Sequence, residues 1–346
     1  MLQMLLPGIM GDVESALRGS ALLSWLVLAV SFYILAKSAD LFVDSSVSAA
    51  GKFNVPKLVV GLVLVSFATT APELCVSLTA ALKGNPEMAL GNAIGSVICN
   101  TGLALGLAGI VAPAAIKVLP AVLRTSGIFL IIVAVLCFIF VRADFTLSRM
   151  EGAVLVAFFT VYLYIMFRKY RSGAIPMQHD DTDEHSKHKQ LTLPQISALF
   201  ALGLSGIIAA SEFIVIAATS IAHMLHVPEA VIALTLVALG TSIPEVATCI
   251  ISAKKGHGEI AVGNILGANI LNICWVAGAS SIGNSLVLSK KEISFMFPAM
   301  FAITGVMLFL LWKNYRFTRI KGIFLLLLYL VYIAFTMYFF PPDQIL

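Results

Sequence analysis

Charged side chains are scarce in this sequence. Only 12% of its 346 residues are Asp, Glu, Lys or Arg, whereas 60% are hydrophobic, and the mean hydropathy is +0.99. Soluble globular domains average about 25% charged residues, so this composition excludes a soluble fold. Apolar stretches of about 20 residues, the length that crosses the hydrocarbon of a bilayer, recur through almost the whole chain. The sequence therefore predicts an integral membrane protein surrounded by lipid.

Cysteine and histidine are also rare, and their placement excludes several functions. The five cysteines lie inside apolar runs without a C-x-x-C spacing, which indicates small core residues rather than a metal or redox site. The apolar spans contain no Ser/His/Asp or Cys/His set, so we expect neither an enzyme nor a bound cofactor. The basic residues are spread over loops without interleaved aromatics, which excludes nucleic acid as a partner.

The chain contains an internal repeat. Residues 61–110 recur without a gap 172 positions later, at 233–282, and 18 of the 50 aligned pairs are identical. The shared polar residues form the patterns Thr-x-x-Pro-Glu and Gly-Asn-x-x-Gly-x-x-x-x-Asn. Placing polar groups inside an apolar span has an unfavourable free energy, so their repetition indicates a function.

Breaks rich in charge or in Gly, Pro and Asn divide the chain into ten predicted helical spans. They cover residues 21–48, 57–82, 86–112, 118–141, 147–168, 192–222, 228–253, 258–286, 292–312 and 320–340. A shift of 172 positions places the first five on the last five. We therefore expect an all-α polytopic membrane protein with ten transmembrane helices. Because five is odd, the two five-helix repeats are inverted, as in many secondary transporters.

The expected organisation has four parts. They are an N-terminal extension (1–20), a first five-helix repeat (21–171), a linker (172–190) and a second five-helix repeat (191–346). With both termini outside, cytoplasmic loops hold fifteen basic residues and outer loops six, so the positive-inside rule favours that orientation with a cytoplasmic linker. The linker contains acids and histidines; it is interpreted as solvated, with a regulatory cation site as the alternative.

Each repeat carries one glutamate, Glu73 or Glu245, near the middle of a span. An acid at that depth costs about 2.5 to 3.5 kcal/mol on insertion scales, so each should face a wet or cation-filled cavity. A protonated glutamate within the bundle is the alternative. Two acids at equivalent positions favour cation ligation. Lys37 and Asp40 in the first span are interpreted as an ion pair within one helix, with a role in cation entry as the alternative.

A proline precedes each glutamate, at Pro72 and Pro244. Proline inside a helix removes an N–H and clashes with the carbonyl four residues earlier, so loosened backbone is expected there. Freed carbonyls, threonine hydroxyls and two carboxylates would form an all-oxygen cage. Such a cage suits a hard cation such as Ca²⁺, which takes about 6 to 8 oxygen ligands.

The second part of each motif opens an apolar span with two glycines four residues apart. These pairs are Gly91 and Gly95, and Gly263 and Gly267. The spacing is typical of close helix packing. Packing does not account for Asn100 and Asn272, which lie deeper in their spans and could offer amide oxygens to a cation.

The two segments resemble the alpha repeats of the cation/calcium exchanger superfamily, and in particular those of the sodium/calcium exchangers of the prokaryotic type. The alpha-1 motif covers 61–110 and the alpha-2 motif covers 233–282. The resemblance covers the transmembrane core, 21–340. It implies ten helices, a central site built from both repeats, and antiport of Na⁺ against Ca²⁺ by a single chain in the cell membrane.

Carried over position by position, the resemblance implies Ca²⁺ ligands at Thr69, Glu73, Thr241 and Glu245. The residues implied to bind Na⁺ or to flank those sites are Ser66, Thr70, Ser96, Asn100, Ala238, Ser242, Ala268 and Asn272. At Ser66, Ala238 and Ala268 the implied ligand is a backbone carbonyl. Val97 and Ala268 stand where the family pattern has polar groups, and Asn272 stands where K⁺-dependent relatives carry Asp, which argues against K⁺ dependence.

Three functions stay open at this point. The leading one is Na⁺/Ca²⁺ antiport by alternating access, in which the first and sixth helices slide across a fixed binding block. The alternative keeps the fold but couples transport to H⁺, or carries another divalent cation such as Mg²⁺. A channel or a cation sensor ranks last, because a channel needs a continuous pore, usually in a symmetric assembly, whereas this chain carries its own two-fold repeat.

Overall fold

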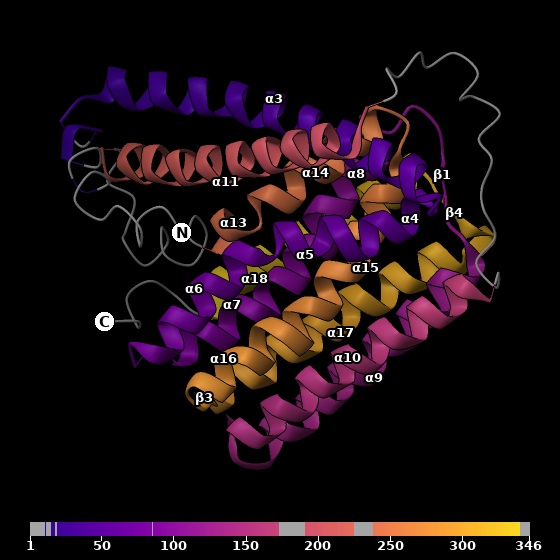
Figure 1. Cartoon of the computed structure of the whole chain (residues 1–346). Coiled ribbons are helices and arrows are strands. Elements are labelled where there is room, and N and C mark those ends of the chain that lie inside the picture. The colour runs from indigo at the N-terminus through magenta and orange to yellow at the C-terminus, as the bar shows by residue number, and fades with distance from the viewer. Residues whose placement is uncertain are drawn as a thin grey trace.

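The computed structural model describes residues 11, 15–17, 19–84, 86–172, 191–224 and 238–339, with residues 222, 223 and 238 described by their backbone alone. This part of the chain is helical apart from four short strands (Figure 1). Within the described residues, eight helices are long and apolar enough to cross a membrane, and the bent pair Lys57–Thr69 and Ala71–Leu82 would make a ninth span. The predicted all-α membrane protein is confirmed. The expected span 228–253 begins outside the described residues, so the count of ten stays a prediction.

The first half of the chain contains a long helix, the first motif and a helical hairpin. Its elements are α3 (Ala21–Phe53), α4 (Lys57–Val60), the π-helix η1 (Gly61–Val65), α5 (Ser66–Thr69), α6 (Ala71–Leu82), α7 (Pro86–Cys99), the π-helix η2 (Asn100–Ala104), α8 (Leu105–Val111), β1 (Ile116–Lys117), α9 (Pro120–Asp144), β2 (Thr146–Leu147) and α10 (Arg149–Arg171). Ser20 caps α3, and Ser148 with Glu151 forms a capping box on α10. Such caps satisfy backbone N–H groups that have no partner inside the helix.

The second half follows the same order. Its elements are α11 (Leu193–Met224), α13 (Ala238–Thr241), α14 (Ile243–Lys254), α15 (Gly258–Leu271), the π-helix η5 (Asn272–Ala277), α16 (Gly278–Gly283), β3 (Leu286–Val287), α17 (Lys290–Trp312), the 3-10 helix η6 (Lys313–Tyr315), β4 (Arg316–Phe317) and α18 (Arg319–Phe339). The two halves also share local backbone features. Gly84 and Gly256, which are repeat equivalents, both have a positive φ, +85° and +83°, a conformation that favours glycine.

In both motifs a helix stops and restarts just before the glutamate. The helical segments on either side of Thr70 are bent by 41°, and α13 and α14 are likewise separated at Ser242. Pro72 and Pro244 lie in the first turn of the new helices, where a missing N–H costs no hydrogen bond. The loosened backbone expected at the prolines is thus an interruption of the helix.

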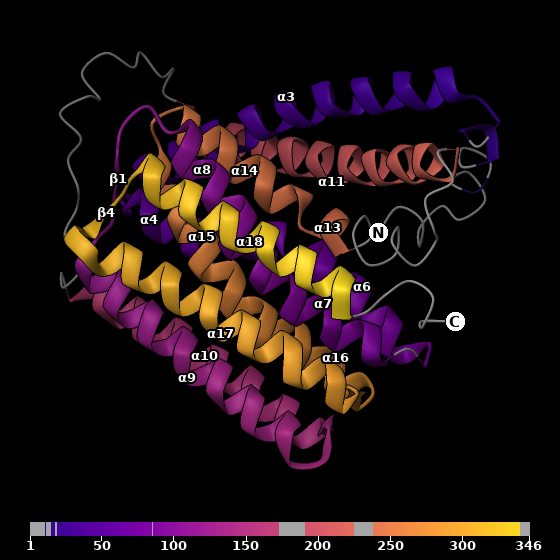
Figure 2. The ribbon, with the colours of Figure 1, turned by 180° about the vertical axis from the view of Figure 1, so that it is seen from behind.

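The helices α3 and α11 lie along one side of the bundle, and α9 and α10 lie along the opposite side (Figure 1). Figure 2 shows α17 and α18 across the back. A close approach joins α3 to α11, because a Cβ on Gly203 would lie 2.7 Å from the backbone nitrogen of Phe42. The motif helices include the most deeply buried span of the core: the most apolar stretch of Gly258–Gly283 is 94% buried, against 17% for Arg319–Phe339. The outer helices therefore present their apolar side chains to lipid.

One predicted glycine pair makes a close helix contact. A Cβ on Gly263 would clash with the carbonyl of Leu58, and one on Gly267 would clash with the carbonyl of Leu62. For the other pair, Gly91 and Gly95, no described atom lies within 4 Å of such a Cβ. The segment equivalent to 58–62 is 230–234, which lies outside the described residues.

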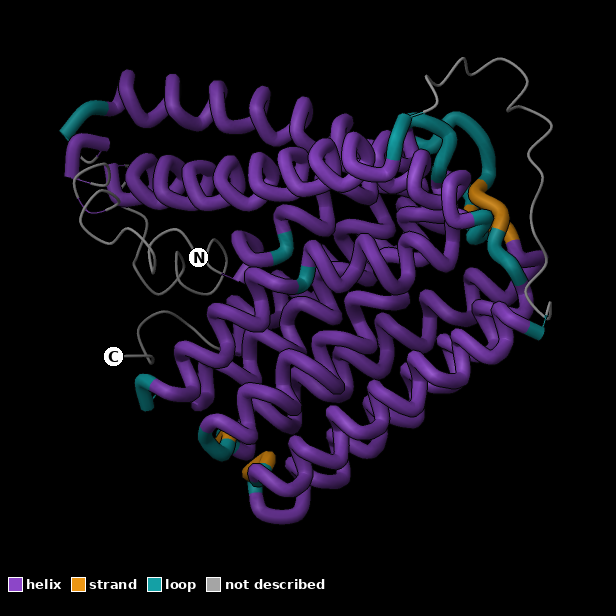
Figure 3. The backbone as a smooth tube through the Cα atoms, in the orientation of Figure 1, coloured by secondary structure: helices purple, strands orange, loops and turns teal. Residues whose placement is uncertain are grey.

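The four strands form two antiparallel pairs. Ile116 of β1 lies opposite Phe317 of β4, and Thr146 of β2 lies opposite Val287 of β3. Adding the repeat offset of 172 to the residues of β1 gives 288–289, directly after β3, so β1 and β3 hold corresponding places in the two halves. Figure 3 shows the two strand pairs at opposite ends of the bundle.

Candidate functional site

The two glutamates of the repeats meet at one buried centre. Glu73 lies in the first turn of α6 and Glu245 in the first turn of α14, and both side chains are fully buried. Their carboxyl groups are close enough to interact electrostatically with each other. The N-terminus of a helix carries a partial positive charge that favours a carboxylate. Each interrupted helix therefore begins where it stabilises its own acid.

Most of the carboxylate oxygens lack a protein partner. Among the described residues, neither oxygen of Glu73 nor Oε2 of Glu245 makes a hydrogen bond, and no basic side chain there forms an ion pair with either acid. Buried polar groups are normally hydrogen-bonded, and an unpaired buried charge costs several kcal/mol. Two adjacent acids in this state require cations or protons between them.

The hydroxyl that follows each motif threonine contacts the acid of the opposite repeat. Thr70 Oγ1 donates a hydrogen bond to Glu245 Oε1 at 3.2 Å. Ser242, its repeat equivalent, lies within interaction range of Glu73, and its hydroxyl donates to Ser96 Oγ at 3.3 Å. The two motifs are therefore interleaved at the centre, and neither acid is surrounded by its own repeat alone.

The motif threonines are held by two asparagines. Thr69 Oγ1 donates to Asn264 Oδ1 at 3.3 Å, and Thr241 Oγ1 donates to Asn92 Oδ1 at 3.1 Å. Thr69 also lies within interaction range of Glu245. These asparagines belong to the repeated polar pattern of the sequence, but that pattern alone did not assign them to the site. Their identity in both repeats, inside apolar spans, was the signal that could have found them.

Asn100 and Asn272 lie on π-helices that pack against the glutamate helices, η2 against α14 and η5 against α6. Each is fully buried and is the first residue of a π-helix, η2 or η5. No described residue is hydrogen-bonded to either amide side chain. Cys99, next to Asn100, interacts with both glutamates. Short π-helical segments within α-helices frequently occur at functional sites, and these two leave amide groups without a protein partner.

The remaining predicted residues are less directly placed. Ser66 is fully buried, but its hydroxyl donates to the carbonyl of Leu62 at 2.6 Å, within its own helical segment. Ala268 is buried in α15, and Ala238 begins α13 with its side chain outside the described part. The structure thus brings together Thr69, Thr70, Glu73, Ser96, Ser242 and Glu245. Ser66 is linked to that centre through its backbone carbonyl, which accepts a hydrogen bond from Thr69 Oγ1 at 3.4 Å, whereas no described side chain is hydrogen-bonded to Ala268.

A further buried polar pair joins the repeats without symmetry. Asn269 Nδ2 donates to Thr101 Oγ1 at 2.8 Å, and both residues are fully buried. Their repeat equivalents are the apolar residues Val97 and Ile273. Pairwise comparison of the repeats hides such a contact, because each polar residue is aligned with an apolar one. The centre is therefore symmetric at its acids and asymmetric beside them.

No group of three or more His, Cys, Asp or Glu that could hold a metal ion occurs in the ranges that the structure describes. The acids and histidines of the linker alternative lie outside those ranges. All five cysteines are free, and four are buried, namely Cys99, Cys137, Cys249 and Cys274. This agrees with their interpretation as core residues.

The two interrupted helices supply buried carboxylate and hydroxyl oxygens, and the helices packed beside them supply amide oxygens; this is the class of membrane-protein site that suits hard cations, since such ions prefer oxygen ligands. The family model described as "Sodium/calcium exchanger protein" matches residues 23–168 and 196–338. The chain belongs to the sodium/calcium exchanger family, a family of membrane ion exchangers and not of enzymes.

Two curated relatives match almost end to end. The putative antiporter CaxA of Alkalimonas amylolytica is 32% identical over 90% of this chain and 98% of its own length. The sodium/calcium exchanger MaX1 of Methanosarcina acetivorans is 28% identical over 91% and 99%. A solved structure of the sodium-calcium exchanger NCX_Mj, soaked with zero Na⁺ and Ca²⁺, superposes with a TM-score of 0.76 at 28% identity, covering 91% of this chain and 99% of that one.

Proposed function

We propose that this protein exchanges Na⁺ for Ca²⁺ across the cell membrane by alternating access, as a single chain. The observation that carries the proposal is the pair of fully buried acids, Glu73 and Glu245, of whose four carboxylate oxygens three have no hydrogen-bond partner among the described residues. Two carboxylates offset the double charge of Ca²⁺, and Thr69 and Thr241 add hydroxyl oxygens beside them. Backbone carbonyls of the interrupted helices complete the oxygen cage that this ion prefers.

Competition for the same acids supplies the coupling. Ca²⁺ takes both carboxylates at once, whereas Na⁺ ions are bound singly by one carboxylate together with neutral oxygens. We assign these neutral groups to Ser66, Thr70, Ser96, Asn100, Ala238, Ser242, Ala268 and Asn272. Without bound cations the two acids would be buried unpaired charges, which is costly. The protein therefore does not switch its site from one side of the membrane to the other while the site is empty. Only the cation-loaded states make that switch.

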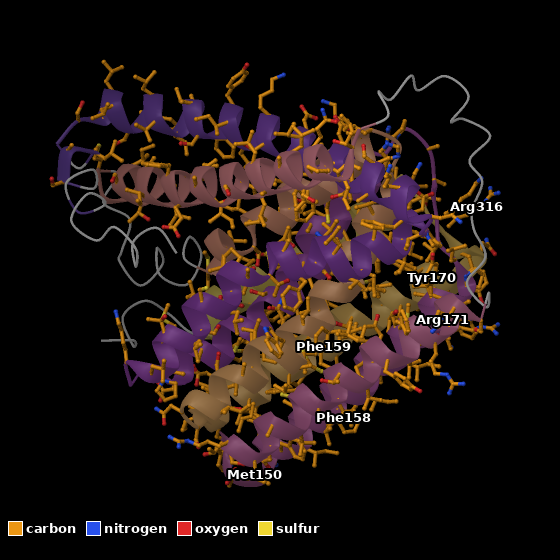
Figure 4. The ribbon with its side chains drawn as sticks, in the orientation of Figure 1. Met150, Phe158, Phe159, Tyr170, Arg171 and Arg316 are labelled. Atoms are coloured by element: carbon orange, nitrogen blue, oxygen red, sulfur yellow. The ribbon has the colours of Figure 1, made fainter. Side chains whose placement is uncertain are left out.

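The proposed architecture is ten helices in two inverted five-helix repeats. Its support is that the corresponding strands β1 and β3 lie at opposite ends of the bundle (Figure 3). Figure 4 shows Arg171 and Arg316 at one end and Met150 at the other. We assign the end with Arg171 to the cytoplasm, because cytoplasmic loops are enriched in basic residues. The linker 172–190 is then cytoplasmic and both termini are outside.

The moving part is the α3–α11 pair. These helices pack along each other, and α3 also contacts α14 of the core. The two helices carry none of the motif residues, so they can slide across the site without disturbing its oxygen ligands. This arrangement lets the pair expose the centre to one side of the membrane at a time, which is the gating expected for repeat-based transporters.

The experiment is ⁴⁵Ca²⁺ flux in proteoliposomes under separate Na⁺, K⁺ and pH gradients. An outward Na⁺ gradient should drive Ca²⁺ uptake, and a K⁺ gradient should not. Glu73→Gln and Glu245→Gln should each lower the rate at least a hundredfold, since each removes a charge that the bound ion needs. Ser126→Ala, which removes a hydroxyl bonded to Tyr162 away from the site, is the matched control and should transport normally.

Two results would replace the proposal. Ca²⁺ uptake that follows a pH step and ignores Na⁺ would establish the H⁺-coupled alternative. Uptake of Mg²⁺ in preference to Ca²⁺ would establish another divalent cargo. Absence of any cation flux from correctly folded wild-type protein would reject exchange altogether.

A further inference from the structure

Asn92 and Asn264 each hold a threonine that belongs to the opposite repeat. The Oγ1–Oδ1 distances are 3.1 Å for Thr241 with Asn92 and 3.3 Å for Thr69 with Asn264. Each residue of one contact lies 172 positions from its counterpart in the other. A chance contact has no reason to recur at both equivalent places, so the arrangement follows from the repeat itself.

Each asparagine is in turn anchored to the helix that carries a glutamate. Asn92 Nδ2 donates to Ser77 Oγ at 3.0 Å, and Asn264 Nδ2 donates to Cys249 Sγ at 3.6 Å. Ser77 and Cys249 are repeat equivalents and lie four residues after Glu73 and Glu245. Residues four apart lie on the same face of a helix. Two chains of hydrogen bonds result, each called an arm below. Each arm runs from the helix of one acid, through an asparagine, to the threonine of the other repeat.

The direction of these hydrogen bonds determines what each threonine offers to an ion. A hydroxyl has one proton and two lone pairs, whereas the amide oxygen is only an acceptor. With its proton donated to Asn264, Thr69 presents lone pairs elsewhere. Without that acceptor, the proton could rotate to the carbonyl of Ser66, 3.4 Å away, or to Glu245, which lies within interaction range. Either rotation would turn the threonine oxygen away from the ion, and a proton on Glu245 would also occupy carboxylate lone pairs that a cation needs.

We propose that Asn92 and Asn264 are positioning residues of the cation site, which orient Thr241 and Thr69 with their lone pairs toward the ion. This inference rests on the proposed function, because it takes the two threonines as Ca²⁺ ligands. The two arms are unequal. Ser77 is a good acceptor, whereas the sulfur of Cys249 is a weak one, so the Asn92 arm holds its threonine more firmly.

The test is a double-mutant cycle on ⁴⁵Ca²⁺ uptake and on Ca²⁺ binding by the purified chain. Substitution of residues that orient metal ligands typically costs about 10-fold to 100-fold in affinity, so Asn264→Leu should raise the Ca²⁺ KM about tenfold. In a Thr69→Val background the same change should add less than about twofold, because the oriented hydroxyl is already gone. In a Thr241→Val background it should again cost about tenfold, since independent sites contribute additively.

A second variant tests the other arm with a smaller change. Ser77→Ala removes the anchor of Asn92 and should raise the Ca²⁺ KM severalfold. This increase should largely disappear in a Thr241→Val background and should persist in a Thr69→Val background. Ser252→Ala is the matched control, because in the described part of the chain this fully buried hydroxyl on α14 donates to a backbone carbonyl of its own helix, that of Cys249, at 3.2 Å. It should leave the KM unchanged.

The outcomes separate this inference from the function on which it rests. If wild-type protein shows no Na⁺-driven Ca²⁺ uptake, the proposed function fails first. If wild type transports and Asn264→Leu keeps its KM, or raises it equally in both threonine backgrounds, the positioning role is wrong while exchange stands. If Asn264→Leu does not fold, the Ser77→Ala cycle decides by the same criterion.

Discussion

Lys255 lies 2.8 Å from Asp44, measured from Nζ to Oδ1. The same ammonium lies 3.2 Å from the carboxylate of Asp40, so one lysine in the turn after α14 binds two successive turns of α3. Asp40 was expected to pair with Lys37 on its own helix, and that interpretation is wrong: Lys37 instead lies over the ring of Tyr33, 5.8 Å from its centroid. The ion pair ties α3 to the core next to the interrupted helix of the second repeat.

If α3 slides during transport, fixing this contact should stop the cycle. We expect that Asp44→Cys with Lys255→Cys, joined by a reducible bifunctional methanethiosulfonate reagent, loses Na⁺-driven Ca²⁺ uptake, and that reductant restores it. Cys75→Ala provides the background, because Cys75 is the one native cysteine that is not buried. Each single cysteine treated in the same way should transport normally. Full transport by the cross-linked protein would show that α3 and α14 do not move apart.

The repeat equivalents of Lys255 and Asp40 are Lys83 and Glu212. The described structure contains no ion pair between these two residues. Because the repeats are inverted, we expect Lys83 and Glu212 to approach each other when the site opens to the opposite side of the membrane. Cross-linking of Lys83→Cys with Glu212→Cys should therefore increase when Lys255→Ala removes the first contact.

The expected increase is modest. An exposed ion pair contributes about 0.2 to 1 kcal/mol, and a change of about 1 kcal/mol shifts a two-state ratio roughly fivefold. The yield of the 83–212 cross-link should thus rise by up to about fivefold. A yield that is independent of Lys255, or that is already complete in its presence, would contradict the reciprocal arrangement.

Much of the fold could be predicted because the membrane restricts the solutions. Apolar length and breaks predicted the helical spans, and Pro72 and Pro244 marked both interruptions. The partner of Asp40 could not be predicted. A sequence shows neighbours along one helix, such as Lys37, whereas the actual partner, Lys255, lies 215 residues away and is brought close only by packing.

The site was predictable only in part, for a related reason. Repetition identified Glu73 and Glu245, since an acid in an apolar span needs a partner. Asn92 and Asn264 belong to the repeated polar pattern, but no role could be given to them, because nothing in the sequence shows that each contacts a threonine of the other repeat. The pair of Asn269 and Thr101 aligns with apolar residues, so comparison of the repeats could not reveal it.

The buried acids predict an unusual dependence of stability on cations. Two unit charges about 4 Å apart repel by on the order of 4 kcal/mol at an effective dielectric constant of 20. Glu73→Gln should therefore raise the melting temperature in the presence of a chelator while removing the stabilisation by Ca²⁺ seen in wild type. Glu292→Gln, at the capping box of α17, is the control and should keep the Ca²⁺ response. Stabilisation of Glu73→Gln by Ca²⁺ equal to that of wild type would place the ion elsewhere.

Gly267 predicts how tightly the first motif packs on α15. A methyl group there would clash with the backbone carbonyl of Leu62 and with the hydroxyl of Ser66, and backbone cannot move aside cheaply. Overpacking of this kind costs about 1 to 3 kcal/mol, so Gly267→Ala should lower the melting temperature and the transport rate together. Gly305→Ala, on the exposed face of α17 with no described atom within 4 Å, is the matched control. It should be neutral or stabilising by up to about 1 kcal/mol, because alanine favours a helix over glycine. Equal effects of the two substitutions would mean that α15 does not need this close approach.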